Sequence, residues 1–200
     1  MIDFDSKARG WDDVPGRRER ATAVATAIRK NVRLSGQMSA LEYGCGTGLL
    51  SFALQPRLGH ITLADSSSGM LDVLKEKISS SGAKNMTPLL LDLSIDPLPT
   101  ERFDLVYTLM TLHHIADTLD ILRKFHDLLK PSGIVCIADL NKEDGTFHDH
   151  EFEGHHGFDR VQLRKLLIQA DFKKIRFTTP FSIKKGARVY PLFLAWGEKK

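Results

Sequence analysis

The segment Glu42-Tyr43-Gly44-Cys45-Gly46-Thr47-Gly48 decides the fold, because it joins an apolar run to a helical pattern through a turn rich in glycine. Glycine lets the backbone turn sharply and lets a ligand approach the chain without meeting a Cβ atom. The dinucleotide-binding fingerprint would place Gly or Ala at position 49, but this chain has Leu49 there. The neighbouring acid Glu42 suits a ligand with a cationic amine better than a pyrophosphate, which it would repel.

On both sides of this loop, short apolar runs alternate with helical periodicity, which is typical of a parallel α/β sheet. Pro88 lies within one of these runs and cannot donate to a ladder, so its strand is predicted to be at a sheet edge or to carry a bulge. The expected strands cover residues 39–43, 60–64, 86–91, 103–108, 134–140, 173–179 and 189–196, the last two forming a hairpin around Gly186. The expected helices cover residues 17–33, 49–54, 70–82, 115–129 and 158–170.

The composition predicts one soluble domain, since 42% of the 200 residues are hydrophobic and 26% are charged. Neither Cys45 nor Cys136 lies in a Cys-x-x-Cys pair, which argues against a disulfide framework and a structural zinc site. No apolar run approaches the roughly 20 residues that cross a bilayer. The acidic N-terminus lacks the basic and apolar stretch of a secretory signal. We therefore expect a cytoplasmic protein without a membrane span.

The C-terminal part of the chain is basic. Residues 171–200 hold eight lysines and arginines against two acids, whereas the whole chain has a net charge of only +3. Such a segment can contact nucleic acid or an acidic substrate. Lysines also commonly guard an exposed sheet edge. We favour the second interpretation, so nucleic acid is not expected as a partner.

Acidic residues end two successive predicted strands, and the carboxyl ends of strands are where open α/β sheets bind ligands. A carboxylate at Asp65 can accept both hydroxyl groups of a ribose. At Asp92 it can accept from an exocyclic amine such as that of adenine, while the N–H of Leu93 donates to a ring nitrogen. Met70 begins the helix after the second strand, where it can lie against the purine face. Helix capping by Asp65 and turn formation by Asp92 are the structural alternatives.

Together these segments resemble the class I S-adenosylmethionine-dependent methyltransferases, in particular small-molecule enzymes similar to those of quinone biosynthesis. The resemblance runs through residues 42–48, 65–71, 92–93, 103–106, 112–115 and 129–133. It implies a Rossmann-like α/β sheet of seven mostly parallel strands in the order 3-2-1-4-5-7-6, with strand 7 antiparallel and helices on both faces. It also implies one domain over residues 1–200, with an N-terminal lid helix region (1–35) and a core (36–200). The expected cofactor is S-adenosyl-L-methionine, and its product is S-adenosyl-L-homocysteine.

The resemblance further implies roles for individual residues. Trp11 and the helix after it would cover the cofactor as a lid. The nearby Arg17, Arg18 or Arg20 would either meet the carboxylate of the cofactor or lie on a solvated helix face. The residues expected to bind the cofactor are Glu42, Gly44, Cys45, Gly46, Asp65, Ser66, Met70, Asp92, Leu93, Thr108 and Leu109.

Histidines supply the candidates for catalysis and acceptor binding. His113 follows the fourth predicted strand and is predicted either to act as a general base or to form part of the pocket wall. Residues 148–156 hold four histidines and several acids, a set that would bind a metal, line the acceptor pocket or cap the next helix. Because the spacing lacks H-E-x-x-H, no metal is expected. The residues expected to contact the acceptor are Trp11, His114, His156 and Arg160.

The leading hypothesis is methyl transfer to O, N, S or C of a small-molecule acceptor by a monomer or homodimer. One alternative is a non-catalytic S-adenosylmethionine-binding module, and another is an RNA or protein methyltransferase that uses the basic C-terminal segment. A nicotinamide oxidoreductase is a third alternative, against which Leu49 and Asp92 argue. The stretch Tyr107-Thr108-Leu109-Met110 lacks the Pro-Pro motif of enzymes that methylate exocyclic amines of bases or glutamine, which favours other small-molecule acceptors.

Overall fold

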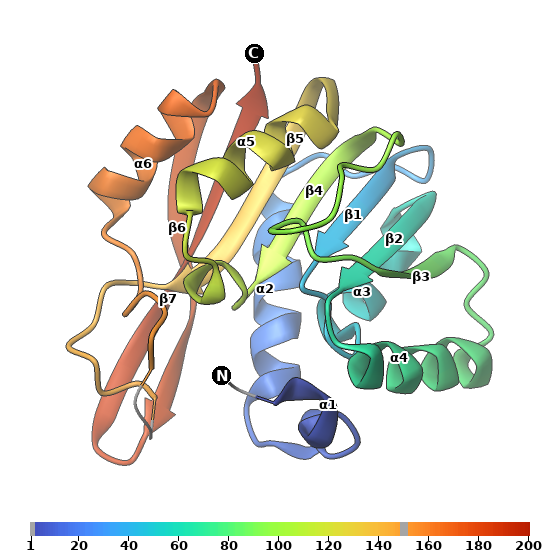
Figure 1. Cartoon of the computed structure of the whole chain (residues 1–200), viewed down its shortest axis with the longest axis horizontal. Helices are drawn as coiled ribbons and strands as arrows, with labels where there is room; N and C mark the ends of the chain where they lie inside the picture. Colours follow the sequence, from blue (N-terminus) through green and yellow to red (C-terminus); the bar gives the residue numbers. More distant parts are fainter. Residues whose placement is uncertain (1–2, 149–151) are drawn as a thin grey trace.

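The structure is a computed structural model that describes residues 3–148 and 152–200. Its centre is a seven-stranded sheet in the order β3-β2-β1-β4-β5-β7-β6 (Figure 1). β7 runs antiparallel to its two neighbours and the remaining strand pairs are parallel, which confirms the predicted Rossmann-like fold. The strands are β1 (Ser39–Tyr43), β2 (His60–Asp65), β3 (Met86–Leu90), β4 (Phe103–Leu109), β5 (Leu129–Leu140), β6 (Phe172–Lys185) and β7 (Arg188–Lys199).

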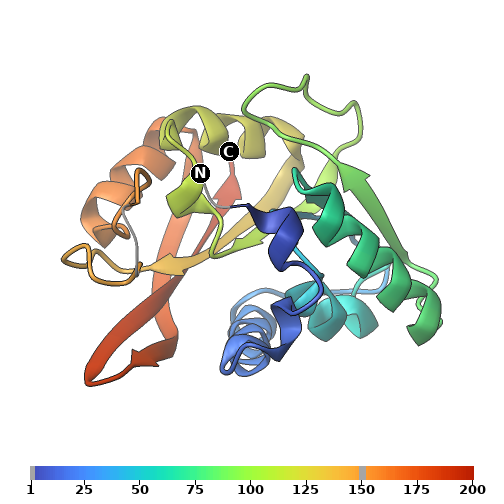
Figure 2. The same cartoon turned by 60° about the horizontal axis from the view of Figure 1, so that its bottom comes forward.

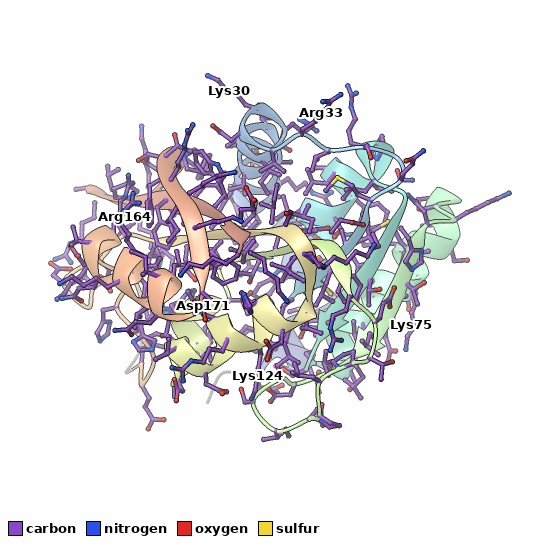
Figure 3. All side chains as sticks on the ribbon, turned by 90° about the horizontal axis from the view of Figure 1, so that it is seen from above. Lys30, Arg33, Lys75, Lys124, Arg164 and Asp171 are labelled. Carbon is purple, nitrogen blue, oxygen red and sulfur yellow. The ribbon has the colours of Figure 1, made fainter. Side chains whose placement is uncertain are left out.

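Helices cover both faces of the sheet (Figure 2). Side chains of α2, α3 and α4 join the core on one face, and those of α5 and α6 join it on the other. Charged side chains such as Lys30, Arg33 and Lys75 are exposed on the outside of the molecule (Figure 3). The helices are α1 (Phe4–Lys7), α2 (Arg17–Asn31), α3 (Leu49–Leu54), α4 (Ser68–Ser81), α5 (Thr118–Leu128) and α6 (Arg160–Gln169), with 3₁₀ turns η1 (Trp11–Asp13), η2 (Gln55–Arg57) and η3 (Leu112–His114).

The central strands are buried on both faces, as their apolar runs predict. In β1, Leu41 packs with α5 and α6 while Ala40 packs with α2 and α3. In β4, Val106 and Leu105 divide between the same two faces. This alternation follows from the period of two residues in a strand. It leaves the carboxyl ends of β1 and β4 side by side, next to the loops that build the site.

The two edges of the sheet agree with the sequence-based expectations. β3 is an edge strand, so Pro88 costs the sheet no interior hydrogen bond. β6 is the opposite edge and carries lysines at both of its ends, among them Lys174 and Lys185. The hairpin turn around Gly186, with φ of +57°, is where it was expected. Both hairpin strands are longer than predicted.

Several elements differ from the predictions. The helix expected over 115–129 begins only at Thr118, because the carboxylate of Asp117 caps it by accepting from the N–H of Asp120 at 2.9 Å. It ends at Leu128, and β5 begins at once, with Leu129 paired to Phe103 across a register shift. The strand expected from residue 134 therefore starts five residues earlier. α1 and η1 were not predicted, since elements of four and three residues carry too little periodicity.

Within the described residues, no helix combines the length and the apolar character that crossing a bilayer requires.

Candidate functional site

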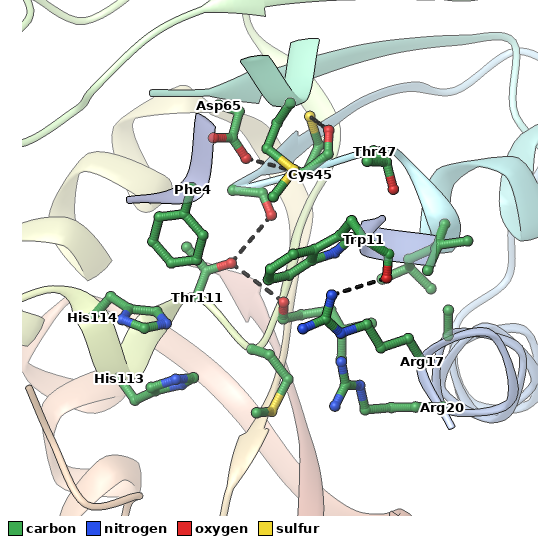
Figure 4. Close-up of a pocket in the computed structure, with 18 of the residues that line it drawn as sticks. Phe4, Trp11, Arg17, Arg20, Cys45, Thr47, Asp65, Thr111, His113 and His114 are labelled. Atoms are coloured by element: carbon green, nitrogen blue, oxygen red, sulfur yellow. Dashed lines mark hydrogen bonds between the residues drawn. The ribbon is translucent and has the colours of Figure 1, made fainter. Parts of the chain in front are cut away.

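A cavity of about 760 Å³ opens at the carboxyl ends of the central strands (Figure 4). Its floor is the glycine loop after β1, where Gly44 has φ of +68° and Gly46 has φ of +52°. A Cβ atom at Gly44 would lie 2.2 Å from Cγ2 of Thr111, so this position requires glycine for space as well as for conformation. The loop therefore presents bare backbone to the cavity, as its composition predicts.

Asp65 ends β2 and lies on the cavity wall beside this loop. Its carboxylate accepts the N–H of Gly46 at 2.6 Å and the N–H of Ser67 at 2.9 Å. Burial raises the pKa of Asp65, and these backbone hydrogen bonds oppose the rise. The N-cap of α4 is Ser67, whose hydroxyl accepts from the N–H of Met70, so the capping alternative for Asp65 is wrong.

Glu42 lies deeper in the same wall and is only 2% exposed. Its carboxyl group accepts a hydrogen bond from the hydroxyl of Ser51, which also contacts the hydroxyl of Tyr107. Burial, the dominant cause, raises the pKa of Glu42 to about 8, and the hydrogen bond from Ser51 lowers it only in part. At neutral pH this group is largely protonated, and a cationic ligand would favour its ionised form.

Asp92 follows β3 and also lies on the wall, where its carboxylate accepts the N–H of Ser94 at 2.8 Å. It therefore forms the turn proposed as its structural alternative, and it still faces the cavity. Leu93 lies behind the wall, and its N–H donates to the hydroxyl of Tyr43 at 3.0 Å instead of pointing into free space. Thr108 is likewise buried behind the wall. Leu93 and Thr108 are the two predicted cofactor residues that the structure does not bring to the cavity.

The other predicted cofactor residues gather at one end of the cavity. Cys45 is buried, and burial raises the pKa of its thiol well above the ordinary value. The wall includes Glu42, Gly44, Cys45, Gly46, Asp65, Ser66, Met70, Asp92 and Leu109.

The N-terminal segment covers the glycine loop as a lid. The indole nitrogen of Trp11 lies 3.7 Å from the place where a Cβ atom of Gly46 would stand. The guanidinium of Arg17 stacks over the indole, 3.4 Å from the ring centroid, and donates to the carbonyl of Trp11 at 2.9 Å. The ring of Phe4 meets Trp11 edge-on and reaches His114 on the other side of the cavity, with centroid separations of 5.9 and 5.4 Å. Only Trp11 of this group was expected at the site as a lid residue.

The three arginines of α2 have different surroundings. Arg18 is exposed and donates to the backbone of Asp12, away from the cavity. Arg17 and Arg20 both line the cavity. Burial lowers the pKa of Arg20 to about 10, repulsion from Arg17 adds to this, and Asp139 opposes it. The expectation of a solvated helix face therefore holds for Arg18 alone.

His113 forms part of the cavity wall on the side away from Asp65 (Figure 4). Its Nδ1 lies 2.7 Å from the carboxylate of Asp139, near the C-terminal end of β5, and both residues are fully buried. The ring of His114 packs on that of His113 with centroids 4.1 Å apart. Burial lowers the pKa of His114 to about 3, so His114 is neutral under ordinary conditions. No pattern in the sequence linked His113 to Asp139, which lies 26 residues away.

The histidine-rich loop after β5 is only partly at the site. His148 lies on the wall and stacks on Phe152, with ring centroids 3.7 Å apart. His156 is directed to Glu143, with 3.2 Å between Nδ1 and Oε1. Arg160 donates to side chains of Asn141 and Thr179 at 2.7 Å each and thereby anchors α6. The predicted acceptor contacts His156 and Arg160 are therefore not on the cavity wall, whereas Trp11 and His114 are.

Metal binding by this loop finds no support in residues 3–148 and 152–200, which contain no group of three or more His, Cys, Asp or Glu side chains arranged around a common point. Asp149, His150 and Glu151 of the predicted cluster lie outside the described residues.

Sequence reasoning missed several wall residues because each lies far along the chain from the glycine loop. They are Phe4, Thr111, Phe147, Lys184 and Lys185. Met110, also on the wall, has φ of +58°, a strained backbone at a position that apolar patterning cannot reveal.

The architecture and the glycine-loop cavity together define the class I methyltransferase fold. Residues 40–133 match the family model described as a methyltransferase domain. A putative methyltransferase of Haloferax volcanii, solved with its Trm112 activator, has a TM-score of 0.78 at 18% identity and covers 99% of this chain and 98% of that one. A SAM-dependent methyltransferase of Aquifex aeolicus has a TM-score of 0.73 at 21% identity, with both chains covered fully. At these identities the structures show the fold alone.

Curated sequences are similar over the same region. An uncharacterized methyltransferase of Schizosaccharomyces pombe is 39% identical over 119 residues, which are 56% of this chain and 42% of the relative. A ubiquinone biosynthesis O-methyltransferase of Marinobacter nauticus is 32% identical over 122 residues, 60% of this chain and 51% of the relative. The chain thus spans about half the length of the curated relatives it matches. Family model, relatives and fold all show similarity to the class I S-adenosylmethionine-dependent methyltransferases.

The residues present fit the cofactor of this class, S-adenosylmethionine. The bare backbone of Gly44 and Gly46, which side chains would fill, offers room for its methionine part. The carboxylate of Asp65 lies beside that loop on the cavity wall, as a partner for its ribose hydroxyls. The lid then closes the cavity from the other side.

Proposed function

We propose that the protein transfers a methyl group from S-adenosylmethionine to a small-molecule acceptor. The observation that carries this proposal is the position of Asp65, which lies 2.6 Å from the N–H of Gly46 at the base of a cavity of about 760 Å³. A carboxylate there can hold the ribose while the glycine backbone accommodates the rest of the cofactor. When bound, the cofactor supplies an electrophilic methyl group on a positively charged sulfur.

Other wall residues would complete the cofactor site. Asp92 is placed to accept from the adenine amine, and Met70 to lie against the purine. Glu42 would meet the cationic amine, which favours its ionised form. We assign the carboxylate of the cofactor to Arg17, because its guanidinium stacks on Trp11, whose indole nitrogen lies close to Gly46.

The chain's own contribution to the reaction is alignment and proton handling. A closed cavity that holds two reactants in line can supply about 7–11 kcal/mol of the barrier reduction in favourable cases. If the acceptor must lose a proton, His113 is the group to take it, because Asp139 engages Nδ1 and leaves Nε2 for a ligand. The lid and the enclosed volume favour a small acceptor over a macromolecule. Both cysteines are buried free thiols, which suits the reducing cytoplasm.

Calorimetry with S-adenosylhomocysteine, with NAD as the competing ligand, tests the cofactor assignment. We expect saturable binding of S-adenosylhomocysteine and none of NAD. Release of S-adenosylhomocysteine from S-adenosylmethionine in the presence of an acceptor panel then separates an enzyme from a binding module. Absence of binding at millimolar S-adenosylhomocysteine would overturn the proposal.

A further inference from the structure

Charged side chains on the cavity wall are sorted by sign. The carboxyl groups of Glu42, Asp65 and Asp92 all lie at the ends of β1, β2 and β3, which form one half of the sheet (Figure 1). The cations come from the N-terminal segment, from α2 and from β6 at the opposite edge. The cationic wall residues are Lys7, Arg17, Arg20, Lys184 and Lys185.

Two of these cations are already held by neutral groups. Arg17 stacks on Trp11 and donates to its carbonyl. Lys185 donates to the carbonyl of Phe147 at 2.7 Å. These contacts orient the side chains but leave their positive charge in place. Arg20 of α2 and the two lysines of β6 make the half of the cavity away from the glycine loop electropositive.

Among these cations, Arg20 has a buried donor that lacks a hydrogen-bond acceptor in the described part of the chain. Its Nε is buried and has no hydrogen-bond partner among the residues that the structure describes. The acid that attracts it, Asp139, already accepts from Nδ1 of His113, from the N–H of His113 and from the N–H of Leu140. A buried charged donor without an acceptor is costly, and an anionic ligand would remove that cost. In Figure 4 the guanidinium lies below Arg17, on the side of the cavity away from Asp65.

We propose that the methyl acceptor carries an anionic oxygen group, a carboxylate or a phosphate, that binds between Arg20 of α2 and Lys184 of β6. This inference rests on the proposed function, since it describes the second ligand of the same cavity. A guanidinium matches such groups because it offers paired N–H donors in a fixed plane. α2 contacts β6, so the two cations belong to neighbouring elements. An anion held there places the rest of the acceptor along the wall that carries His113 and His114.

The cofactor has a carboxylate of its own, and the test must separate the two sources. The protein is first saturated with S-adenosylhomocysteine, so that the cations that bind the cofactor carboxylate are already occupied. Benzoate, inorganic phosphate and the neutral benzamide are then titrated by calorimetry. We expect benzoate or phosphate to bind and benzamide not to bind. The anion that binds shows whether the acceptor carries a carboxylate or a phosphate.

Variants locate the binding. Arg20→Met and Lys184→Met should each weaken anion binding at least tenfold, and Arg20→Lys should restore part of it. Lys165→Met, which removes an equal charge from the exposed side of α6, should leave it unchanged. Loss of S-adenosylhomocysteine affinity in Arg20→Met with intact anion binding would assign Arg20 to the cofactor and overturn the proposal. Binding of S-adenosylhomocysteine without any anion binding would overturn this inference alone, whereas no binding of S-adenosylhomocysteine would overturn the proposed function.

Discussion

The carboxylate of Asp12 lies 2.6 Å from the ammonium nitrogen of Lys77, and this ion pair connects η1, before α2, to α4. Asp12 also accepts from the hydroxyl of Thr47, within that loop. A second acid, Asp5, accepts the N–H of Gly69 at 2.8 Å at the start of α4. Two carboxylates, one before Trp11 in the sequence and one directly after it, thus hold the lid over the cavity.

Asp12→Asn should loosen the lid. The variant loses the charge of a partly buried pair, an effect of about 1.5 kcal/mol for charge-assisted hydrogen bonds, so S-adenosylhomocysteine should dissociate about tenfold faster. Stopped-flow measurement of tryptophan fluorescence reports this rate, since Trp11 is the tryptophan on the cavity wall. Asp13→Asn is the matched control, because Asp13 is exposed. Equal dissociation rates in the two variants would show that the pair does not hold the lid closed.

Asp65→Asn should weaken the nucleoside end of cofactor binding. The expected loss is about 1.5–3 kcal/mol, and it should be equal for S-adenosylhomocysteine and 5′-methylthioadenosine, which share the ribose. Arg17→Met should weaken only S-adenosylhomocysteine, because methylthioadenosine has no carboxylate. Calorimetry on both variants with both ligands gives a two-by-two comparison. A loss in Asp65→Asn confined to S-adenosylhomocysteine would place Asp65 at the amino-acid end instead.

Asp139→Asn should change the tautomer of His113. In the native protein the carboxylate of Asp139 accepts three N–H groups, so Nδ1 of His113 must carry its proton and Nε2 must be the basic atom. An amide at position 139 can donate to Nδ1 and thus favours the opposite tautomer. Nitrogen-15 chemical shifts of the imidazole distinguish the two forms without any ligand. S-adenosylhomocysteine affinity should stay unchanged, and Asp144→Asn, at an exposed acid, serves as the control. An unaltered tautomer would mean that Asp139 does not orient the ring.

Much of the sheet was predictable because strands buried on both faces have a strong apolar signal. Pro88 even located an edge, since its missing N–H is tolerated only there. The helix over 115–129 was misplaced because apolar spacing continues past both of its ends, while the cap at Asp117 and the immediate start of β5 after Leu128 set the true limits.

The site was predictable at the glycine loop and less so elsewhere. A position at the end of a strand does not say which way a side chain points, so Thr108 was expected at the cavity, where only its neighbour Leu109 lies. Contacts between distant residues are invisible in the pattern, as the pair His113–Asp139 and the lid contact Asp12–Lys77 show. These contacts depend on loop paths and on side-chain packing between elements, which the apolar pattern does not specify.

Thr108→Val should stabilise the protein. The hydroxyl of Thr108 is buried and has no hydrogen-bond partner among the described residues, and valine has nearly the same shape. Removing an unsatisfied polar group should raise the free energy of unfolding by about 1 kcal/mol. Because Thr108 lies behind the wall, S-adenosylhomocysteine affinity should not change. Thr118→Val is the control, since Thr118 has a partner in His155 and should lose stability. If Thr108→Val binds S-adenosylhomocysteine more weakly, Thr108 contributes to the cofactor site after all.

Glu42 should make the unliganded protein less stable as the pH rises. Its pKa is raised by burial to about 8 in the folded protein, from an ordinary value of 4.5. Between these two values the folded state keeps a proton that the unfolded state has lost, so the slope of unfolding free energy with pH is negative. The favourable contribution is complete below pH 4.5 and disappears as the pH approaches 8. Glu42→Gln keeps the shape and cannot ionise, so its stability should lack this part of the decline.

Denaturant unfolding of Glu42→Gln and the unchanged protein at pH 5, 6, 7 and 8 measures the difference directly. Other titrating groups are common to both proteins and cancel in the comparison. The stability gap should widen in favour of Glu42→Gln toward pH 8, by a few kcal/mol. A gap that stays constant across the range would show that Glu42 is already ionised in the folded protein. In that case the buried carboxylate would need a cationic partner even before a ligand binds.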